Sequence, residues 1–293
     1  MPEDRAPPRR AARSVRGRAL VWKRFDFRES SRVVALLLRD HGVVHALAKG
    51  AHRAGSPLLG RIDFLNELDV ELSADREGLR LLLRASLQLE RRGLRTPRRF
   101  LAASHFVDAC DAALPAGRGD PDLFDLACGG LQLLERCPPA TIPSVVLGLE
   151  LRLLALLGAL PDLDHCARCG ADLRGQPAFR GEVPGALACR AHAAAPRRAY
   201  AAAALTFLRG LRDTPGRAWP RLPLPLPPTT AQLPGPWLQD ALERRCRLRA
   251  HVFDPAATIV DRRADAPARR PAEQRSDRVA EPAARPLPAD PEG

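Results

Sequence analysis

The sequence predicts an α+β fold, in which a five-stranded barrel of the OB type precedes an all-helical domain that carries an inserted cysteine-rich loop. Three observations predict this class. Short apolar or alternating segments bounded by turn signals fill residues 18–90, and apolar residues recur at every third or fourth position after residue 96; these patterns are typical of strands and of helices. Two closely spaced pairs containing cysteine then interrupt the helical pattern.

Three strands are expected at the start of the barrel. Residues 18–27 alternate loosely, and residues 32–38 are apolar and end at the turn signal Asp40-His41-Gly42. Residues 43–49 follow and stop at Gly50. The last two segments are typical of a hairpin.

Two further strands complete the barrel. Apolar residues stand at every second position over residues 68–72 and again over residues 79–89, with a turn expected at residues 75–78. None of these segments is followed by a helix long enough for a parallel crossover. The pattern therefore favours a small antiparallel barrel such as an OB fold, with an SH3-like barrel as the closest alternative.

After residue 96 the pattern becomes helical. Helices are expected over residues 98–113, 121–136 and 143–160. Each has a proline near its first turn, where a missing N–H costs little. The third helix has one broad apolar face, and we expect it at the centre of its domain. Weaker helices are expected over 201–212 and 236–250, and the proline-rich linker 215–236 cannot form a regular helix.

Both ends of the chain lie outside these periodic segments. Residues 1–17 are rich in Pro and Arg, and residues 257–293 repeat Pro, Ala, Arg, Asp and Glu with seven arginines against seven acids. We therefore expect a disordered arm at 1–17, a barrel domain over 18–95, a helical domain over 96–256 and a disordered, solvated tail at 257–293.

No feature of the sequence favours a membrane location. The first 18 residues lack the apolar core of a secretory signal. The longest apolar stretch, Val145–Leu160, contains Glu150 and Arg152, as a buried helix does more often than a membrane span. We expect a soluble cytoplasmic protein.

Four potential metal ligands lie in two matched pairs. Cys166 and Cys169 are separated by two residues, and so are Cys189 and His192. A CxxC turn presents two thiolates together, and zinc takes four N or S ligands in tetrahedral geometry. A set of four leaves no open position. The sequence therefore predicts one structural zinc ion that staples an inserted loop over residues 164–194, with incidental buried cysteines as the alternative.

The remaining cysteines and one further histidine are weaker candidates. Single cysteines on expected helices are usually small core residues; these are Cys110, Cys128, Cys137 and Cys246. His165 is adjacent to Cys166, and neighbouring residues rarely bind the same metal, so it ranks below the four ligands above.

Positive charge is concentrated in the first half of the barrel. The formal net charge of +12 favours a polyanionic partner, either nucleic acid or an acidic protein surface. Residues 18–61 hold nine basic and three acidic residues, whereas residues 62–76 hold one basic and five acidic residues. OB folds bind single strands on strands 2 and 3 and in the adjoining loops. The candidate contacts in this segment are Lys23, Arg24, Arg28, Arg32, Arg39, Lys49, Arg53 and Arg61.

Aromatic residues and a flexible loop accompany these cations. Trp22, Phe25 and Phe27 are interleaved with basic residues, as a base-stacking surface requires. Burial of Trp22 or Phe25 inside the barrel is the simpler alternative, since barrel strands bury alternate residues. The loop 50–60 either closes over a bound strand or is a solvated connection. A second basic cluster, at Arg91, Arg92, Arg95, Arg98 and Arg99, marks the domain junction.

No catalytic motif is present in the sequence. A GxxxxGK[ST] loop, a GxSxG elbow, an HExxH helix and the zinc-deaminase pattern are all missing. A non-enzymatic binding role is therefore favoured. A zinc enzyme is disfavoured because the ligand set is closed.

Over residues 18–252 these pieces, in this order, resemble the bacterial RecO family of DNA repair proteins. The most specific segments are Phe27-Arg-Glu-Ser-Ser-Arg-Val-Val, Asp40-His-Gly-Val-Val, Ala46-Leu-Ala-Lys-Gly-Ala51 and Leu59-Gly60. Leu149-Glu-Leu-Arg-Leu-Leu-Ala-Leu-Leu-Gly158, leading into Cys166-Ala-Arg-Cys169-Gly170, is similar to the central helix and zinc entry of that family.

The resemblance implies a recombination mediator of the RecF pathway that acts at the nucleoid. Such a factor binds single- and double-stranded DNA, anneals complementary strands, works with RecR, and helps to load RecA onto strands coated with single-strand-binding protein. By match to the family's basic segments, Arg28, Arg32, Lys49 and Arg53 are the leading DNA contacts.

Three positions depart from the family pattern. His192 stands where zinc-bearing relatives usually have cysteine, and it is still a zinc ligand. Gly148 stands where a basic residue is expected before the central helix, which argues against docking of the acidic tail of single-strand-binding protein at that point. The linker 215–236 is unusually rich in proline.

A zinc-ribbon transcription or translation factor with a nucleic-acid-binding barrel is the alternative function. It predicts sequence-selective or RNA-selective binding. A mediator predicts sequence-tolerant binding that weakens steeply with salt.

Overall fold

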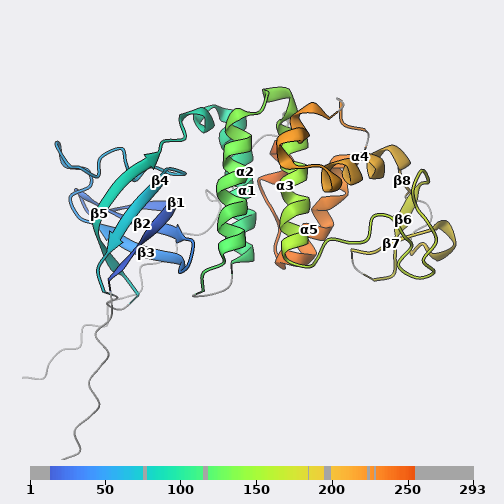
Figure 1. Ribbon diagram of the computed structural model, residues 1–293, viewed down its shortest axis with the longest axis horizontal. Coiled ribbons are helices and arrows are strands. Elements are labelled where there is room, and N and C mark those ends of the chain that lie inside the picture. Colours follow the sequence, from blue (N-terminus) through green and yellow to red (C-terminus); the bar gives the residue numbers. More distant parts are fainter. Residues whose placement is uncertain are drawn as a thin grey trace, which may run out of the picture. The chain divides into compact units, whose positions relative to one another are not determined.

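The computed structural model describes residues 14–74, 78–114, 118–183, 185–194, 199–222, 225–227 and 229–254 (Figure 1). The expected disordered tail 257–293 and residues 1–13 of the expected arm lie outside the described residues. So do residues 75–77 of the expected turn between the last two strands.

The first five strands form a closed barrel, as predicted. They are β1 (Val15–Phe27), β2 (Ser31–Leu38), β3 (Gly42–Ala48), β4 (Glu67–Leu72) and β5 (Arg80–Leu89). Their order around the barrel is β1-β2-β3-β5-β4, and the barrel closes through antiparallel pairing of β1 with β4 and parallel pairing of β3 with β5. This topology is OB-like. The first strand begins at Val15, so residues 15–17 belong to the barrel and not to the expected arm.

The barrel has two apolar layers because β1 and β2 are covered on both faces. Val21 and Leu36 face the barrel interior. Leu20, Trp22 and Leu37 belong to the core that the helices form. Trp22 is therefore a core residue, fully buried, and its indole Nε1 donates a hydrogen bond of 2.9 Å to Asp111 Oδ1 on α1. Burial of both faces fixes the outer side of these strands against the helical domain.

The helical domain contains the first four predicted helices, with shifts of up to four residues at their ends, and two shorter helices after them. They are α1 (Pro97–Ala113), α2 (Pro121–Arg136), α3 (Ile142–Leu156), α4 (Ala202–Asp213), α5 (Pro234–Leu242) and α6 (Arg249–Phe253). The central helix is α3, which packs against α1, α2, α4 and α5 (Figure 1). The segment Pro139–Leu156 has the length and hydropathy of a membrane span, but 67% of it is buried inside the fold. That burial is what a central core helix requires.

The expected single helix over 236–250 is wrong. Helix α5 begins two residues earlier, at Pro234, and ends at Leu242, because the next residue, Glu243, has a left-handed φ of 50° that breaks the helix. A separate short helix, α6, follows. Within the described part of the linker 215–236, the chain forms 3-10 turns at Gly216–Arg221 and Thr230–Gln232. The exclusion of a regular helix is wrong for residues 234–236, which form the first turn of α5, where proline is tolerated because its missing N–H is not needed.

Gly148 lies against a tryptophan of the linker. A Cβ at Gly148 would come within 2.6 Å of the Trp219 ring, and Trp219 is itself buried, with its Nε1 donating to the Leu211 carbonyl at 2.9 Å. Only glycine leaves room for the ring on this side of α3. The missing side chain that departs from the family pattern is thus explained by packing.

The inserted loop forms a small sheet of its own between α3 and α4. Its strands are β6 (Ala178–Arg180), β7 (Leu187–Ala188) and β8 (Ala199–Tyr200), in the order β7-β6-β8. Leu163, Leu173 and Leu187 of this loop are buried in the helical core. They anchor the loop, and the cysteine pairs stand where it turns.

Candidate nucleic-acid interface and metal centre

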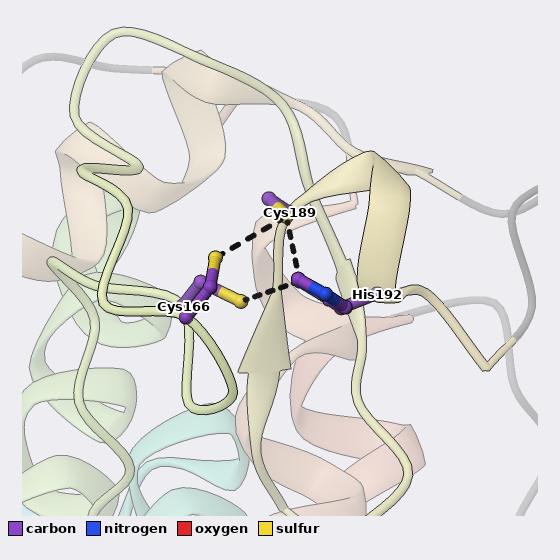
Figure 2. A group of neighbouring side chains, drawn as sticks. Cys166, Cys189 and His192 are labelled. Carbon is purple, nitrogen blue, oxygen red and sulfur yellow. Dashed lines mark hydrogen bonds between the residues drawn. The ribbon is translucent and has the colours of Figure 1, made fainter.

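The four predicted metal ligands come together. Cys166 and Cys169 lie in the turn after α3, Cys189 follows β7, and His192 ends the 3-10 turn Arg190–His192. One donor atom from each of the four lies within 4.8 Å of the others. Figure 2 shows Cys166, Cys189 and His192 directed toward one another.

The donor spacing fits a tetrahedral metal ion. Cys169 Sγ lies 3.9 Å from Cys189 Sγ. His192 Nδ1 lies 3.4 Å from Cys189 Sγ and 3.9 Å from Cys166 Sγ (Figure 2). Tetrahedral zinc, with bonds of about 2.3 Å to sulfur and about 2.0 Å to nitrogen, requires edges of roughly 3.5 to 3.8 Å. Three thiols and an imidazole at these separations are able to hold a metal ion without a further ligand.

The protein backbone favours the thiolate form at one of these positions. Burial opposes ionisation of Cys166, but hydrogen bonds from backbone N–H groups of Cys189, Cys169 and Arg168 outweigh it and lower the pKa of the Cys166 thiol to about 6. A metal ion binds the thiolate form of cysteine, so the lowered pKa of Cys166 favours metal binding at this turn.

The other sulfur and imidazole groups do not join this cluster. Burial raises the pKa of all four remaining cysteine thiols: Cys110, Cys128, Cys137 and Cys246. The pKa rises to about 12 for Cys128 and to about 11 for Cys246. These four thiols therefore stay protonated as core residues. His165 instead contacts Asp162, with Nδ1 3.0 Å from Oδ2.

Five of the eight predicted nucleic-acid contacts are held by other protein groups. Lys23 Nζ lies 2.6 Å from Asp111 Oδ2, Arg24 pairs with Asp63, Arg32 Nη2 lies 3.0 Å from Asp26 Oδ1, Arg39 Nη2 lies 2.8 Å from Asp125 Oδ2, and Arg61 donates to the Ala85 carbonyl at 3.2 Å. Four of these five cations are in ion pairs with acids of the chain, whereas Arg61 is held only by a neutral carbonyl and keeps its charge.

The other three cations, Arg28, Lys49 and Arg53, line one pocket. It has a volume of about 420 Å³ and lies where the β1–β2 turn meets the end of β3; its walls are Phe27, Arg28, Ser30, Ser31, Leu47, Lys49, Gly50 and Arg53. No acidic residue lines it. Among the described residues, none of the three cations has an ion-pair partner. We call this site the three-cation pocket.

Asp26, which precedes the pocket residue Phe27 on β1, is compensated by its own neighbours. Asp26 accepts hydrogen bonds of 3.0 Å from Arg32 and makes a 3.0 Å contact with His52 Nε2. The hydrogen bond from Arg32, followed by that from His52, holds the pKa of the Asp26 carboxyl below its usual range. His52 also ties the loop after β3 to β1, so that Arg53 is presented at the pocket.

An apolar row crosses the barrel surface beside this pocket. Strand register places Phe25, Val33, Leu47 and Leu81 opposite one another on successive strands. The Phe25 ring is 55% exposed, and Phe27 is 40% exposed with the Arg28 guanidinium 5.2 Å from its ring centre. The row was not predictable from spacing, because it depends on the pairing register of four strands. Cations with exposed rings are the chemistry that holds phosphates and stacks bases.

Most of the second basic cluster is held by acids and carbonyls of the chain itself. Arg91 is buried and pairs with Glu67 and, at 3.4 Å, with Glu135. Arg92 and Arg95 both pair with Glu90, at 2.7 and 2.8 Å, and Arg99 donates to backbone carbonyls at the end of α2. Arg91 and Arg99 therefore bind this segment to α2, whereas Arg92 and Arg95 form local, exposed pairs with Glu90.

Comparison with known proteins gives consistent matches over both parts of the chain. The family model described as Recombination protein O N terminal matches residues 13–88, and the one described as Recombination protein O C terminal matches residues 94–232. Proteins named DNA repair protein RecO from Geobacter metallireducens and Geobacter sulfurreducens are 34% and 33% identical over 177 and 179 residues. Each alignment covers 60% of this chain and 71% of the relative. The protein of that name from Rhodopirellula baltica is 32% identical over 158 residues, which cover 53% of this chain and 57% of the relative.

Proposed function

Because the chain belongs to the RecO family of DNA repair proteins, we propose that it is a recombination mediator that binds single-stranded DNA at the three-cation pocket. The observation that carries this proposal is the convergence of Arg28, Lys49 and Arg53, without compensating acids, beside exposed phenylalanine rings. Phosphates bind unpaired cations more strongly than paired ones, because no existing ion pair has to be broken.

The wider role follows from the family resemblance. It comprises binding to double-stranded DNA, annealing of complementary strands and, with RecR, loading of RecA onto strands coated with single-strand-binding protein. Gly148, packed under Trp219, supplies no charge for the acidic tail of that protein, so any contact with the tail lies elsewhere on this chain. The role is non-enzymatic, and it places the protein in the cytoplasm at the nucleoid.

A structural zinc ion belongs to the same proposal. Cys166, Cys169, Cys189 and His192 would hold it, and their 3.4 to 3.9 Å separations support this choice. The ion would fix the loop between α3 and α4 and take no part in chemistry, because four protein donors complete its coordination.

The double variant Lys49→Ala/Arg53→Ala tests the proposed DNA site. We expect single-strand affinity to fall roughly five- to twentyfold at low salt, since two exposed charge contacts are lost. Each phosphate contact contributes about 0.7 to the slope of log affinity against log salt concentration for a single strand. The loss of two contacts should therefore reduce the magnitude of this slope by about 1.4. Fluorescence anisotropy of a labelled oligonucleotide, titrated with salt, measures both.

The matched control removes two charges from elsewhere. Arg136 and Arg221 are exposed and have no ion-pair partner among the described residues, so Arg136→Ala/Arg221→Ala makes the same change in net charge. Equal losses for the two double variants would leave only a general charge effect and reject the site. If unlabelled DNA does not displace the labelled oligonucleotide, but unlabelled RNA of one sequence does, the protein is a sequence-selective RNA-binding factor instead.

A further inference from the structure

A second basic pocket lies at the opposite end of β3. Its volume is about 580 Å³, and its walls are Asp40, His41, Val43, Val44, His45, Gly78, Arg80, Arg118 and Gly119. Two arginines and two histidines thus face a single acid. Arg118 comes from the segment between α1 and α2, so the helical domain contributes to this pocket. Among the described residues, Arg118 has no ion-pair partner.

Strand β3 connects the two pockets. Its Ala46 and Ala48 are buried in the barrel, and the alternation of a strand places the intervening side chains on the outer face. Leu47 and Lys49 line the three-cation pocket, whereas Val43 and His45 line the second one. The six steps along the strand from Val43 to Lys49 span about 20 Å.

Backbone packing fixes Arg118 against the barrel. A Cβ at Gly42 would lie 2.9 Å from the Arg118 carbonyl carbon, and a Cβ at Gly119 would lie 2.6 Å from the backbone nitrogen of His41. Two glycines therefore let the β2–β3 turn and the start of α2 meet backbone to backbone. Arg118 is held beside β3 by this contact.

We propose that one single strand of nucleic acid runs along β3 from the three-cation pocket to Arg118, so that barrel and helical domain hold the same strand. This inference rests on the proposed function. The row Phe25, Val33, Leu47 and Leu81 crosses β3 between the two ends. A single strand has exposed bases that pack on such a row, whereas a duplex offers mainly phosphates and base edges. Arg118 and His45 take the phosphates beyond the row.

Arg118→Ala, compared with oligonucleotides of two lengths, tests this path. A strand of about two nucleotides is too short to reach both ends of a path of about 20 Å, whereas one of about sixteen nucleotides covers the largest site that a single OB fold binds. We expect Arg118→Ala to weaken binding of the longer strand roughly two- to fivefold, the range of one exposed charge contact, and to leave the shorter strand unaffected. For the longer strand, the slope of log affinity against log salt concentration should be smaller in magnitude by about 0.7 in this variant than in wild type.

Arg136→Ala is the matched control, since Arg136 is an exposed arginine at the far end of the helix that Arg118 precedes. Equal effects of the two variants on the longer strand would overturn the path, and so would an equal effect of Arg118→Ala on a duplex of the same length. Loss of binding in Lys49→Ala/Arg53→Ala with none in Arg118→Ala would overturn the path alone. No loss in either would reject the proposed DNA site itself.

Discussion

Replacing Glu150 with glutamine is expected to lower the free energy of unfolding by about 3 to 5 kcal/mol, the usual cost of breaking a buried ion pair. Glu150 is buried on α3, where both its oxygens accept hydrogen bonds of 2.8 Å from Arg249 of α6. Its Oε1 also lies 2.8 Å from His105 Nε2 of α1. The amide cannot compensate the Arg249 charge, so three helices lose a shared contact. Urea unfolding at neutral pH measures the loss.

The pH dependence of this loss has a defined sign. Burial raises the pKa of the Glu150 carboxyl, but the Arg249 charge and the His105 hydrogen bond outweigh it, so the pKa lies below its ordinary value. The stabilisation is therefore complete above the ordinary glutamate pKa and is lost as pH falls through the lower, folded value. Wild type and Glu150→Gln should converge in acid.

Glu182→Gln is the control for this variant. Glu182 is exposed and pairs with exposed Arg168 at 3.3 Å, a contact worth about 1 kcal/mol or less. A Glu150→Gln variant no less stable than this control would show that the buried triad does not hold the helices together.

Removing the proposed metal ion is the second change with a large expected effect. Structural zinc sites contribute about 10 kcal/mol or more of apparent binding free energy in small domains. We therefore expect Cys169→Ala to lose the bound ion and to lower the melting temperature of the full chain strongly. Single-strand affinity should change little, because the ligands lie after α3 and the three-cation pocket lies on the barrel. Metal analysis, thermal melts and anisotropy on the same preparations check this.

Cys246→Ala separates metal loss from thiol loss. Cys246 is buried outside the cluster, so its variant should keep one metal ion per chain and be destabilised only by a small cavity. Wild-type protein that contains no metal, or equal falls in stability and DNA affinity for Cys169→Ala, would contradict a separate structural centre.

Local periodicity was sufficient to predict the strands and the first three helices, because alternation and the 3.6-residue period belong to each segment alone. The four ligands were predictable for the same reason, since the two-residue gaps lie within single turns. The break at Glu243 was not predictable. It depends on a left-handed residue that no glycine or proline marks.

Long-range pairing decided the rest. Lys23 and Arg39 look like free cations in the sequence, yet their partners Asp111 and Asp125 lie on helices more than eighty residues later. The leucines of β5 alternate as buried residues do, but an irregularity in its pairing with β4, between Leu82 and Arg84, leaves Leu83 exposed. Which charges stay unpaired, and so which ones are available to a ligand, follows only from the folded chain.

The central claim is that the three-cation pocket serves a ligand and not stability, and Arg28→Asn tests it most directly. Arg28 has a φ of 54°, a left-handed conformation that asparagine tolerates better than arginine. The variant should therefore melt at the same or a slightly higher temperature while single-strand affinity falls roughly two- to fivefold, the range of one exposed charge contact. Unchanged affinity in a variant that is equally or more stable would contradict the claim.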